Sequence, residues 1–375
     1  MRRVWAAMAA CAVFPITPYA AAQDIACAVP AHVDAPATPE SARELRRFAT
    51  GADVRVAVID TGVAPSPELD QVVPGADFVV SGAPDPLHDC DAHGTVVAGT
   101  IAGNTAGIAP DAEVIAIRQT SAHFRSAEPA GSGSLQTLTG AIHNALDLGA
   151  HVINISVVSC VDPRVAPRVD VAGLDAALGR AEAEGAVVVA AAGNLTGDCP
   201  QGSHVFPSHS STVLAVGSRS DPHTVADYSI RVPAGSLQLS AAGRVAAAPS
   251  PDGNGWAGGT VNEKGDVFPF EGTSFAAPVV TGAVALLKQR RPDLTPARVR
   301  EIVAASAEPS GGAIDPLAVA TQLAPDALEH TDRMVVGPAR GHTSAAPGRW
   351  LKFASALAVF VLVIVVGSAL RPRAA

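Results

Sequence analysis

Three short stretches of this chain, far apart in the sequence, carry the side chains that a serine nucleophile needs. Asp60 ends the apolar stretch VRVAVID, His93 lies in DCDAHGTVVAG, and Ser274 lies in GTSFAAP. A serine hydroxyl is a weak nucleophile until an imidazole takes its proton, and the imidazole needs a carboxylate to fix its tautomer and stabilise its charged form. If folding brings the three groups together, they can carry out acyl transfer at a carbonyl carbon.

Each of these residues also has an ordinary structural interpretation. Asp60 before Thr-Gly is typical of a turn residue that caps the next amides. His93 before Gly-Thr is typical of a surface or capping residue. Thr273 or Ser274 is a typical helix N-cap, and Pro278 lies early in the helix, where backbone N–H groups are least needed. Motifs this detailed, in this order in one chain, favour catalysis over separate structural roles.

The segments between these residues alternate between apolar runs and helical patterns, which predicts an α/β fold. Apolar strands separated by helices indicate a mostly parallel central sheet that helices cover on both faces, giving three layers. Active sites in such sheets lie at the carboxyl ends of strands. Residues 229–268 are rich in Gly, Pro and Ser and predict loops and short extended pieces. The predicted strands are 54–63, 112–120, 151–158, 187–194 and 211–218, and the predicted helices are 41–49, 94–103, 134–150, 171–186, 274–289 and 295–307.

The two ends of the chain predict export and a membrane tether. Residues 1–22 contain two arginines, a short apolar run and small residues, which is typical of a secretory signal; an uncleaved N-terminal anchor is the alternative. Residues 351–370 predict a transmembrane helix, since 353–370 carry no charge; a buried globular helix is the alternative. The Pro/Ala/Gly-rich residues 323–350 predict a linker, and 371–375 a cytoplasmic tail, so the body of the chain lies outside the membrane.

Composition narrows the class of protein further. The formal charge is −9 and no Lys/Arg stripe is present, which argues against nucleic acid as a partner. Aromatic residues make up only 4% of the chain, so the core must consist of Ala, Val, Ile and Leu. Four cysteines follow the leader and predict two disulfides with three pairings open, or else free buried thiols; no CxxC spacing indicates a metal site. These four are Cys27, Cys90, Cys160 and Cys199.

At the three chemical segments the chain resembles the subtilisin-like serine proteases. The pattern of that family, D-[ST]-G, H-G-T-x-x-A-G and G-T-S-x-[AS]-x-P in this order, stands here as DTG, HGTVVAG and GTSFAAP. The resemblance covers roughly residues 50–310. It implies a subtilisin-like three-layer fold and peptide-bond hydrolysis with Asp60, His93 and Ser274 as the catalytic triad.

The same resemblance implies further site residues. Asn194 in VVAAAGN donates to the developing oxyanion together with the Ser274 N–H, although a Gly-Asn turn is the alternative. The strand VINISVV pairs with an extended substrate, and Ala190–Gly193 form the opposite wall of S1, the pocket for the residue before the scissile bond. The family usually has Ser-Leu-Gly where this chain has Ser-Val-Val, which predicts narrow specificity or a small residue in S1. The substrate-binding residues so assigned are Ser156, Val157, Val158, Ala191, Ala192 and Gly193.

A closer resemblance is to the mycosins, membrane-tethered subtilisin-like proteases of type VII secretion systems. The leader, the cysteines, the proline-rich linker and the apolar C-terminal segment all match. The resemblance implies the pairs Cys27–Cys90 and Cys160–Cys199. It also implies an N-terminal extension, residues 23–50, that wraps the peptidase domain, residues 51–322, without blocking the cleft. We expect no metal and no cofactor.

These features lead to two functional hypotheses of different class. The first is a single-pass, membrane-anchored extracytoplasmic serine endopeptidase that cleaves a secreted protein or peptide and acts with a type VII secretion complex. The second is a structural subunit of that complex in which catalysis is dispensable. A general scavenging protease is a third possibility, and the tether argues against it.

Overall fold

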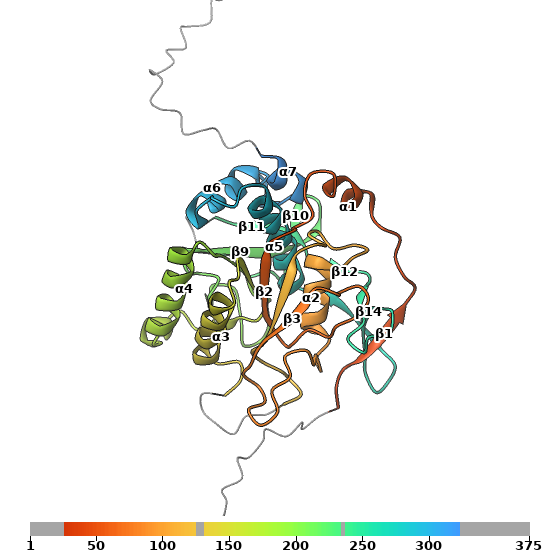
Figure 1. The fold of residues 1–375 in the computed structure, drawn as a ribbon. Coiled ribbons are helices and arrows are strands. Elements are labelled where there is room, and N and C mark those ends of the chain that lie inside the picture. Colours follow the sequence, from red (N-terminus) through yellow and green to blue (C-terminus); the bar gives the residue numbers. More distant parts are fainter. Residues whose placement is uncertain (1–25, 125–130, 234–236, 323–375) are drawn as a thin grey trace, which may run out of the picture. The chain divides into compact units, whose positions relative to one another are not determined.

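The computed structural model describes residues 26–124, 131–233 and 237–322 (Figure 1). The predicted leader, linker, transmembrane helix and tail lie outside these residues. Within the described ranges, no helix has the length and apolar character needed to cross a bilayer.

A mostly parallel sheet forms the centre of the structure, as the alternating pattern predicts, but it has eight strands where the pattern predicts five. Its order is β10-β9-β7-β5-β2-β4-β3, with β11 also pairing with β9. The pairs from β3 to β9 and β9–β11 are parallel, and only β10 runs antiparallel. The strands are β2 (Arg55–Asp60), β3 (Val72–Asp77), β4 (Glu113–Arg118), β5 (Val152–Ile155), β7 (Val187–Ala191), β9 (Val213–Asp221), β10 (Thr224–Val225) and β11 (Leu239–Ala242).

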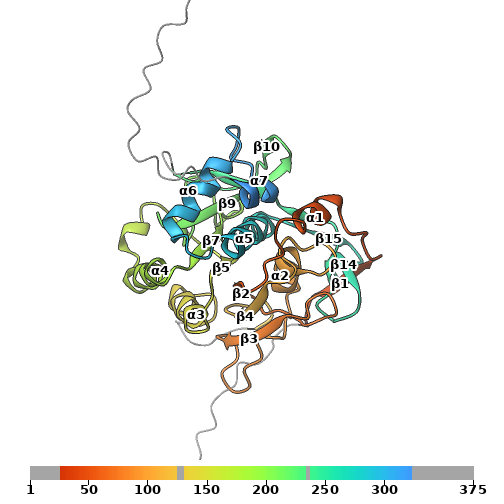
Figure 2. The ribbon, with the colours of Figure 1, turned by 45° about the horizontal axis from the view of Figure 1, so that its top comes forward.

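Helices cover both faces of this sheet and create two apolar cores (Figure 2). Alternate residues of β2 show the division: Val56 and Val58 pack with α2 and α5, whereas Ala57 and Ile59 pack with α3 and α4. The three predicted layers are therefore present. The helices are α1 (Glu40–Leu45), α2 (His93–Ala102), α3 (Leu135–Asp147), α4 (Ala172–Glu184), α5 (Thr273–Arg290), α6 (Pro296–Ser306) and α7 (Pro316–Thr321), with a 3-10 turn at Ala166–Arg168.

A second sheet lies beside α2 and includes the N-terminal extension. Its order is β1-β14-β15-β12, and β13 pairs with β14. The sequence pattern predicts only loops and short extended pieces for residues 229–268 and no strand in the extension. In the structure, β1 of the extension pairs with β14, which lies more than 200 residues later in the chain. Val29 lies opposite Val261 and Val33 opposite Trp256. The strands are β1 (Val29–Val33), β12 (Arg244–Val245), β13 (Ala248–Pro249), β14 (Trp256–Val261) and β15 (Val267–Glu271).

Two disulfides tie loops to this framework. One joins Cys27 of the extension to Cys90, three residues before α2, and the other joins Cys160 to Cys199. These are the pairs that the mycosin resemblance implies. Cys160 lies in a small two-stranded sheet of β6 (Ser159–Val161) and β8 (His204–Phe206).

Candidate active site

The fold brings Asp60, His93 and Ser274 to the carboxyl ends of the central strands. Asp60 is the last residue of β2, His93 the first of α2, and Ser274 the second of α5. His93 and Ser274 both line one cavity of about 570 Å³. The first turn of α2 packs closely against the chain that follows β2. A Cβ atom on Gly94 would lie 2.0 Å from the carbonyl oxygen of Gly62, so the residue after His93 has no room for a side chain.

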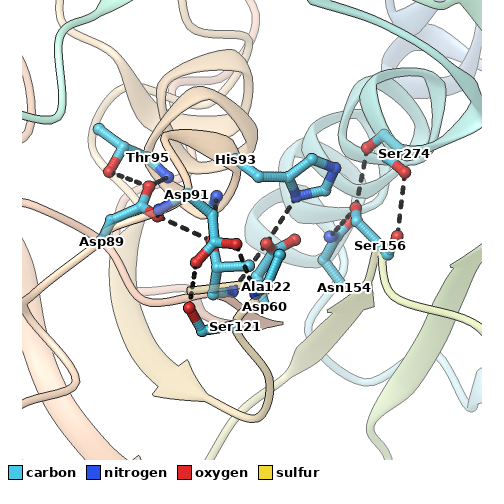
Figure 3. A network of polar contacts seen from close by, with 12 residues as sticks. Asp60, Asp89, Asp91, His93, Thr95, Ser121, Ala122, Asn154, Ser156 and Ser274 are labelled. Carbon is cyan, nitrogen blue, oxygen red and sulfur yellow. Dashed lines mark hydrogen bonds and ion pairs between the residues drawn. The ribbon is translucent and has the colours of Figure 1, made fainter. Parts of the chain in front are cut away.

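Asp60 and His93 form a short, buried pair (Figure 3). His93 Nδ1 lies 2.6 Å from Asp60 Oδ1, which also accepts a hydrogen bond from the Thr61 N–H, and Asp60 is 0% exposed. Because the carboxylate faces Nδ1, the neutral imidazole carries its proton there and keeps a lone pair on Nε2. Burial lowers the pKa of His93, but the charge and hydrogen bond of Asp60 raise it, and the net pKa lies above the usual value. The arrangement gives an oriented imidazole base.

A buried carboxylate that the sequence did not single out holds the loop before α2. Asp89 accepts hydrogen bonds from the Thr61 hydroxyl and from both the N–H and the hydroxyl of Thr95. Burial raises the pKa of Asp89, against the lowering by these hydrogen bonds. Thr61 in turn accepts from the Gly94 N–H, so one network joins the end of β2 to the first turn of α2.

The proline inside α5 explains how Ser274 is held. In a regular helix the carbonyl of Ser274 would accept from the backbone N–H four residues later, but that residue is Pro278, which has none. The Ser156 hydroxyl donates to this carbonyl instead, at 2.8 Å. A buried chain supports Ser156: Thr281 Oγ1 donates to Asn154 Oδ1, and Asn154 Nδ2 donates to Ser156 Oγ. The polar Asn154 in an otherwise apolar strand was the sequence signal for this chain.

The Ser274 hydroxyl donates to the Ser156 carbonyl oxygen at 3.0 Å. Among the residues that the structure describes, no hydrogen bond joins Ser274 to His93. Figure 3 shows the His93 ring between Asp60 and Ser274, with the hydroxyl turned to the Ser156 side. The three groups therefore share one site, and the hydroxyl must rotate to reach the imidazole.

Asn194 lies beside the start of α5. Its Oδ1 accepts a hydrogen bond from the Thr273 N–H at 3.0 Å. With the oxygen so engaged, the Nδ2 amide is the part of this side chain that remains to donate. The preceding Gly193 has φ +98°, and its N–H lies 3.2 Å from the Thr273 hydroxyl oxygen, which accepts from it. Asn194 is thus anchored to the residue before Ser274.

The predicted substrate-binding residues separate into two groups. Ser156, Val157 and Val158 line the cavity together with His93 and Ser274, whereas Ala191, Ala192 and Gly193 are buried and do not line it.

Apolar side chains from two other segments pack close to Gly193. A Cβ on Gly193 would lie 3.4–3.6 Å from methyl and methylene carbons of Ile230 and Val205, both 0% exposed. Val158 packs against the small cluster that contains these two side chains and Cys199.

One grouping has the residue types of a metal site. Ligand atoms of Cys27, His88 and Cys90 lie within 4.8 Å of one another. Both sulfur atoms are joined in the disulfide and are therefore not thiolate ligands.

The comparisons with known proteins agree with this geometry. The subtilase family model matches residues 51–335. The chain is 39% identical to mycosin-4 of Mycobacterium tuberculosis over 72% of this chain, and it spans 63% of that relative's length. It is also 39% identical to mycosin-1 of Mycolicibacterium smegmatis, over 76% of this chain and 72% of the relative.

Solved structures give the same result. The crystal structure of MycP1 from the ESX-1 type VII secretion system superposes with a TM-score of 0.74 at 35% identity, over 83% of this chain and 93% of that one. A chain in the periplasmic assembly from the ESX-5 inner membrane complex gives 0.74 at 29% identity, over 84% and 92%. By sequence and by fold, this chain belongs to the subtilase family of serine peptidases and, among them, to the mycosins.

Proposed function

We propose that this chain is a serine endopeptidase in which Ser274 is the nucleophile, His93 the general base and Asp60 the group that orients the imidazole. The observation that supports this most is the 2.6 Å contact between Asp60 and His93 Nδ1, with His93 and Ser274 lining one cavity. That contact leaves Nε2 as the base on the side where a proton must be taken.

In the proposed reaction, the Ser274 hydroxyl turns from the Ser156 carbonyl to His93 Nε2 and attacks the carbonyl carbon of the scissile bond. The imidazole takes the hydroxyl proton, and the Asp60 carboxylate stabilises the imidazolium. The tetrahedral intermediate collapses when the imidazolium gives its proton to the leaving amine, which leaves an acyl-enzyme that water hydrolyses.

The oxyanion of this intermediate needs donors at the start of α5. We assign this role to Asn194 Nδ2 and the Ser274 N–H. The anchoring of Asn194 Oδ1 by the Thr273 N–H supports the assignment, because it fixes the amide without occupying its donor. One such donor contributes roughly 3–4 kcal/mol of transition-state stabilisation.

The residue before the scissile bond is proposed to be small, such as Gly, Ala or Ser. The proposal is supported by the closeness of Val205 and Ile230 to Gly193 and by the packing of the cavity-lining Val158 against the cluster that contains them. A larger side chain would have to displace packed core atoms, which is costly in a close-packed interior.

We further propose that the enzyme works outside the cytoplasmic membrane, anchored through residues 351–370, as a component of a type VII secretion complex. Its support is the export signal in the sequence and the likeness to a chain of the ESX-5 inner membrane complex. A structural role in that complex is the second candidate, because the same likeness supports it without requiring catalysis.

A fluorophosphonate probe tests the first proposal. The full-length chain should be labelled covalently at Ser274, whereas Ser274→Ala should not be labelled and His93→Ala should be labelled far more slowly. Failure of the folded wild-type chain to react would refute the enzymatic role. Secretion in cells that carry Ser274→Ala, compared with cells that lack the protein, then separates catalysis from a structural role.

A further inference from the structure

We propose that the Cys27–Cys90 disulfide positions the imidazole: it holds the backbone before α2 so that Ala92 stays in a left-handed conformation and His93 Nδ1 stays on Asp60. The proposal rests on the role given above to His93 as the base.

Ala92 has an unusual backbone conformation for its type. It has φ 61° and ψ 9°, in the left-handed region, and it directly precedes His93. Alanine disfavours this region because its Cβ meets the backbone, whereas glycine adopts it readily. Among the described non-glycine residues, only Asp53 also has a positive φ. Something around Ala92 must therefore hold this conformation.

The N-terminal extension holds the chain two residues before Ala92 in two ways. The disulfide fixes the Cys90 side chain, and the Ala28 N–H donates to the Cys90 carbonyl at 2.8 Å. Cys90 is 1% exposed, so water does not compete freely for its hydrogen bond with Ala28. Together they fix both the side chain and the following peptide plane of Cys90.

The extension is itself fixed to a distant part of the fold. Immediately after Cys27 and Ala28, strand β1 pairs with β14. The restraint on Cys90 thus runs through a sheet and not through a loose tail.

Other contacts restrain the same loop, and the test must separate them from the disulfide. Asp91 accepts hydrogen bonds from the Ser121 hydroxyl and the Ala122 N–H. The Asp91 N–H also donates to Asp89 Oδ1 at 3.2 Å, so the Asp89 network restrains the backbone of this loop as well. The proposal is that these contacts alone do not keep Ala92 left-handed once Cys90 is released. Relaxation of Ala92 would move the first residue of α2, and a misplacement of about 1 Å can cost roughly a hundred-fold in rate.

The test uses the full-length chain and four variants. Cys27→Ser/Cys90→Ser removes the Cys27–Cys90 disulfide, which we call the strap. Cys160→Ser/Cys199→Ser is the matched control, which removes the other disulfide. Ala92→Gly is made alone and together with Cys27→Ser/Cys90→Ser. Peptide hydrolysis gives kcat and KM, fluorophosphonate labelling gives the reactivity of Ser274, and thermal unfolding checks that each variant is folded.

We expect loss of the strap to lower kcat by about ten- to a hundred-fold with KM within about two-fold, because substrate contacts are unchanged. Ala92→Gly in that background should restore most of kcat, since glycine adopts the left-handed conformation unaided. Ala92→Gly alone should leave kcat within about two-fold of the wild type. Removing the second disulfide should lower kcat less than removing the Cys27–Cys90 disulfide does.

Two outcomes overturn the proposal: kcat unchanged after loss of the strap, or a loss that Ala92→Gly does not restore in folded protein. If Cys27→Ser/Cys90→Ser fails to fold, folded Cys160→Ser/Cys199→Ser is used instead, and its remaining Cys27–Cys90 disulfide is reduced with a dithiol. Fluorophosphonate labelling of Ser274 that stays unchanged after this reduction refutes the proposal. Wild-type protein that never reacts refutes the enzymatic role itself, so the two failures are distinguishable.

Discussion

The small S1 pocket proposed above makes a specific prediction about Val158. This side chain is half-buried and packs against the cluster that contains Val205 and Ile230, in the space proposed to limit that pocket. Val158→Ala removes two methyl groups from that space and should let the pocket accept a side chain about two carbons longer than the wild type accepts.

The magnitude follows from the carbons exchanged. Each buried methylene contributes about 0.8 kcal/mol, so two contribute roughly 1.6 kcal/mol, or about fifteen-fold in kcat/KM. The ratio of kcat/KM for a peptide with norvaline before the scissile bond to one with alanine should therefore rise by about fifteen-fold. Since Val158 is only half-buried, the fold should lose about 1 kcal/mol of stability.

Val157→Ala is the matched control. Val157 also lines the cavity, but it packs against the opposite core, with α3 and α4. The assay is hydrolysis of a tetrapeptide series that varies only at the residue before the scissile bond. A norvaline-to-alanine ratio that changes by less than about two-fold in Val158→Ala, or equally in both variants, would refute the assignment of Val158 as the side chain that limits this pocket.

Three further predictions concern the other proposed catalytic groups. Asn194→Ala should lower kcat by about a hundred- to a thousand-fold with little change in KM, and an unchanged kcat would exclude Asn194 as an oxyanion donor. Because the pKa of His93 is raised above 6.5 and the base must be neutral, kcat/KM should rise with pH with a midpoint above 6.5; a midpoint below it would contradict the Asp60 contact. By the same shift, the protonated His93–Asp60 pair stabilises the fold fully below pH 6.5 and loses this contribution as pH rises through the folded pKa, which unfolding measured against pH can detect.

Five strands of the central sheet were predictable because they are continuous apolar runs, whereas β3, β10 and β11 are short or contain polar residues, Pro or Gly and were not predicted. The alternation of Val56 and Val58 with Ala57 and Ile59 over both faces is the regular outcome of a strand buried on both sides. Strand β1 escaped prediction because VPAHV contains a proline and a polar residue, and its pairing with β14 depends on a partner more than 200 residues away.

The site was predictable only in part. The motif residues Asp60, His93 and Ser274 do share one region, but the hydroxyl of Ser274 is bonded to Ser156 and not to His93. A side chain's rotamer depends on contacts that no motif encodes. The packing around Gly193 was also hidden, because Val205 and Ile230 come from segments whose patterns give no sign that they meet there.

The reciprocal bonding of Ser156 and Ser274 has a consequence for the order of events in the proposed reaction. One carbonyl, that of Ser156, accepts the nucleophile's own proton at rest. If a peptide substrate pairs with the segment at Ser156, as the proposed function requires, and presents an N–H to the same oxygen, the two donors will compete for it. Substrate binding in this register would thus break the hydrogen bond between the Ser274 hydroxyl and the Ser156 carbonyl and free the hydroxyl to turn to His93. Without substrate, the hydroxyl stays bonded to the main chain.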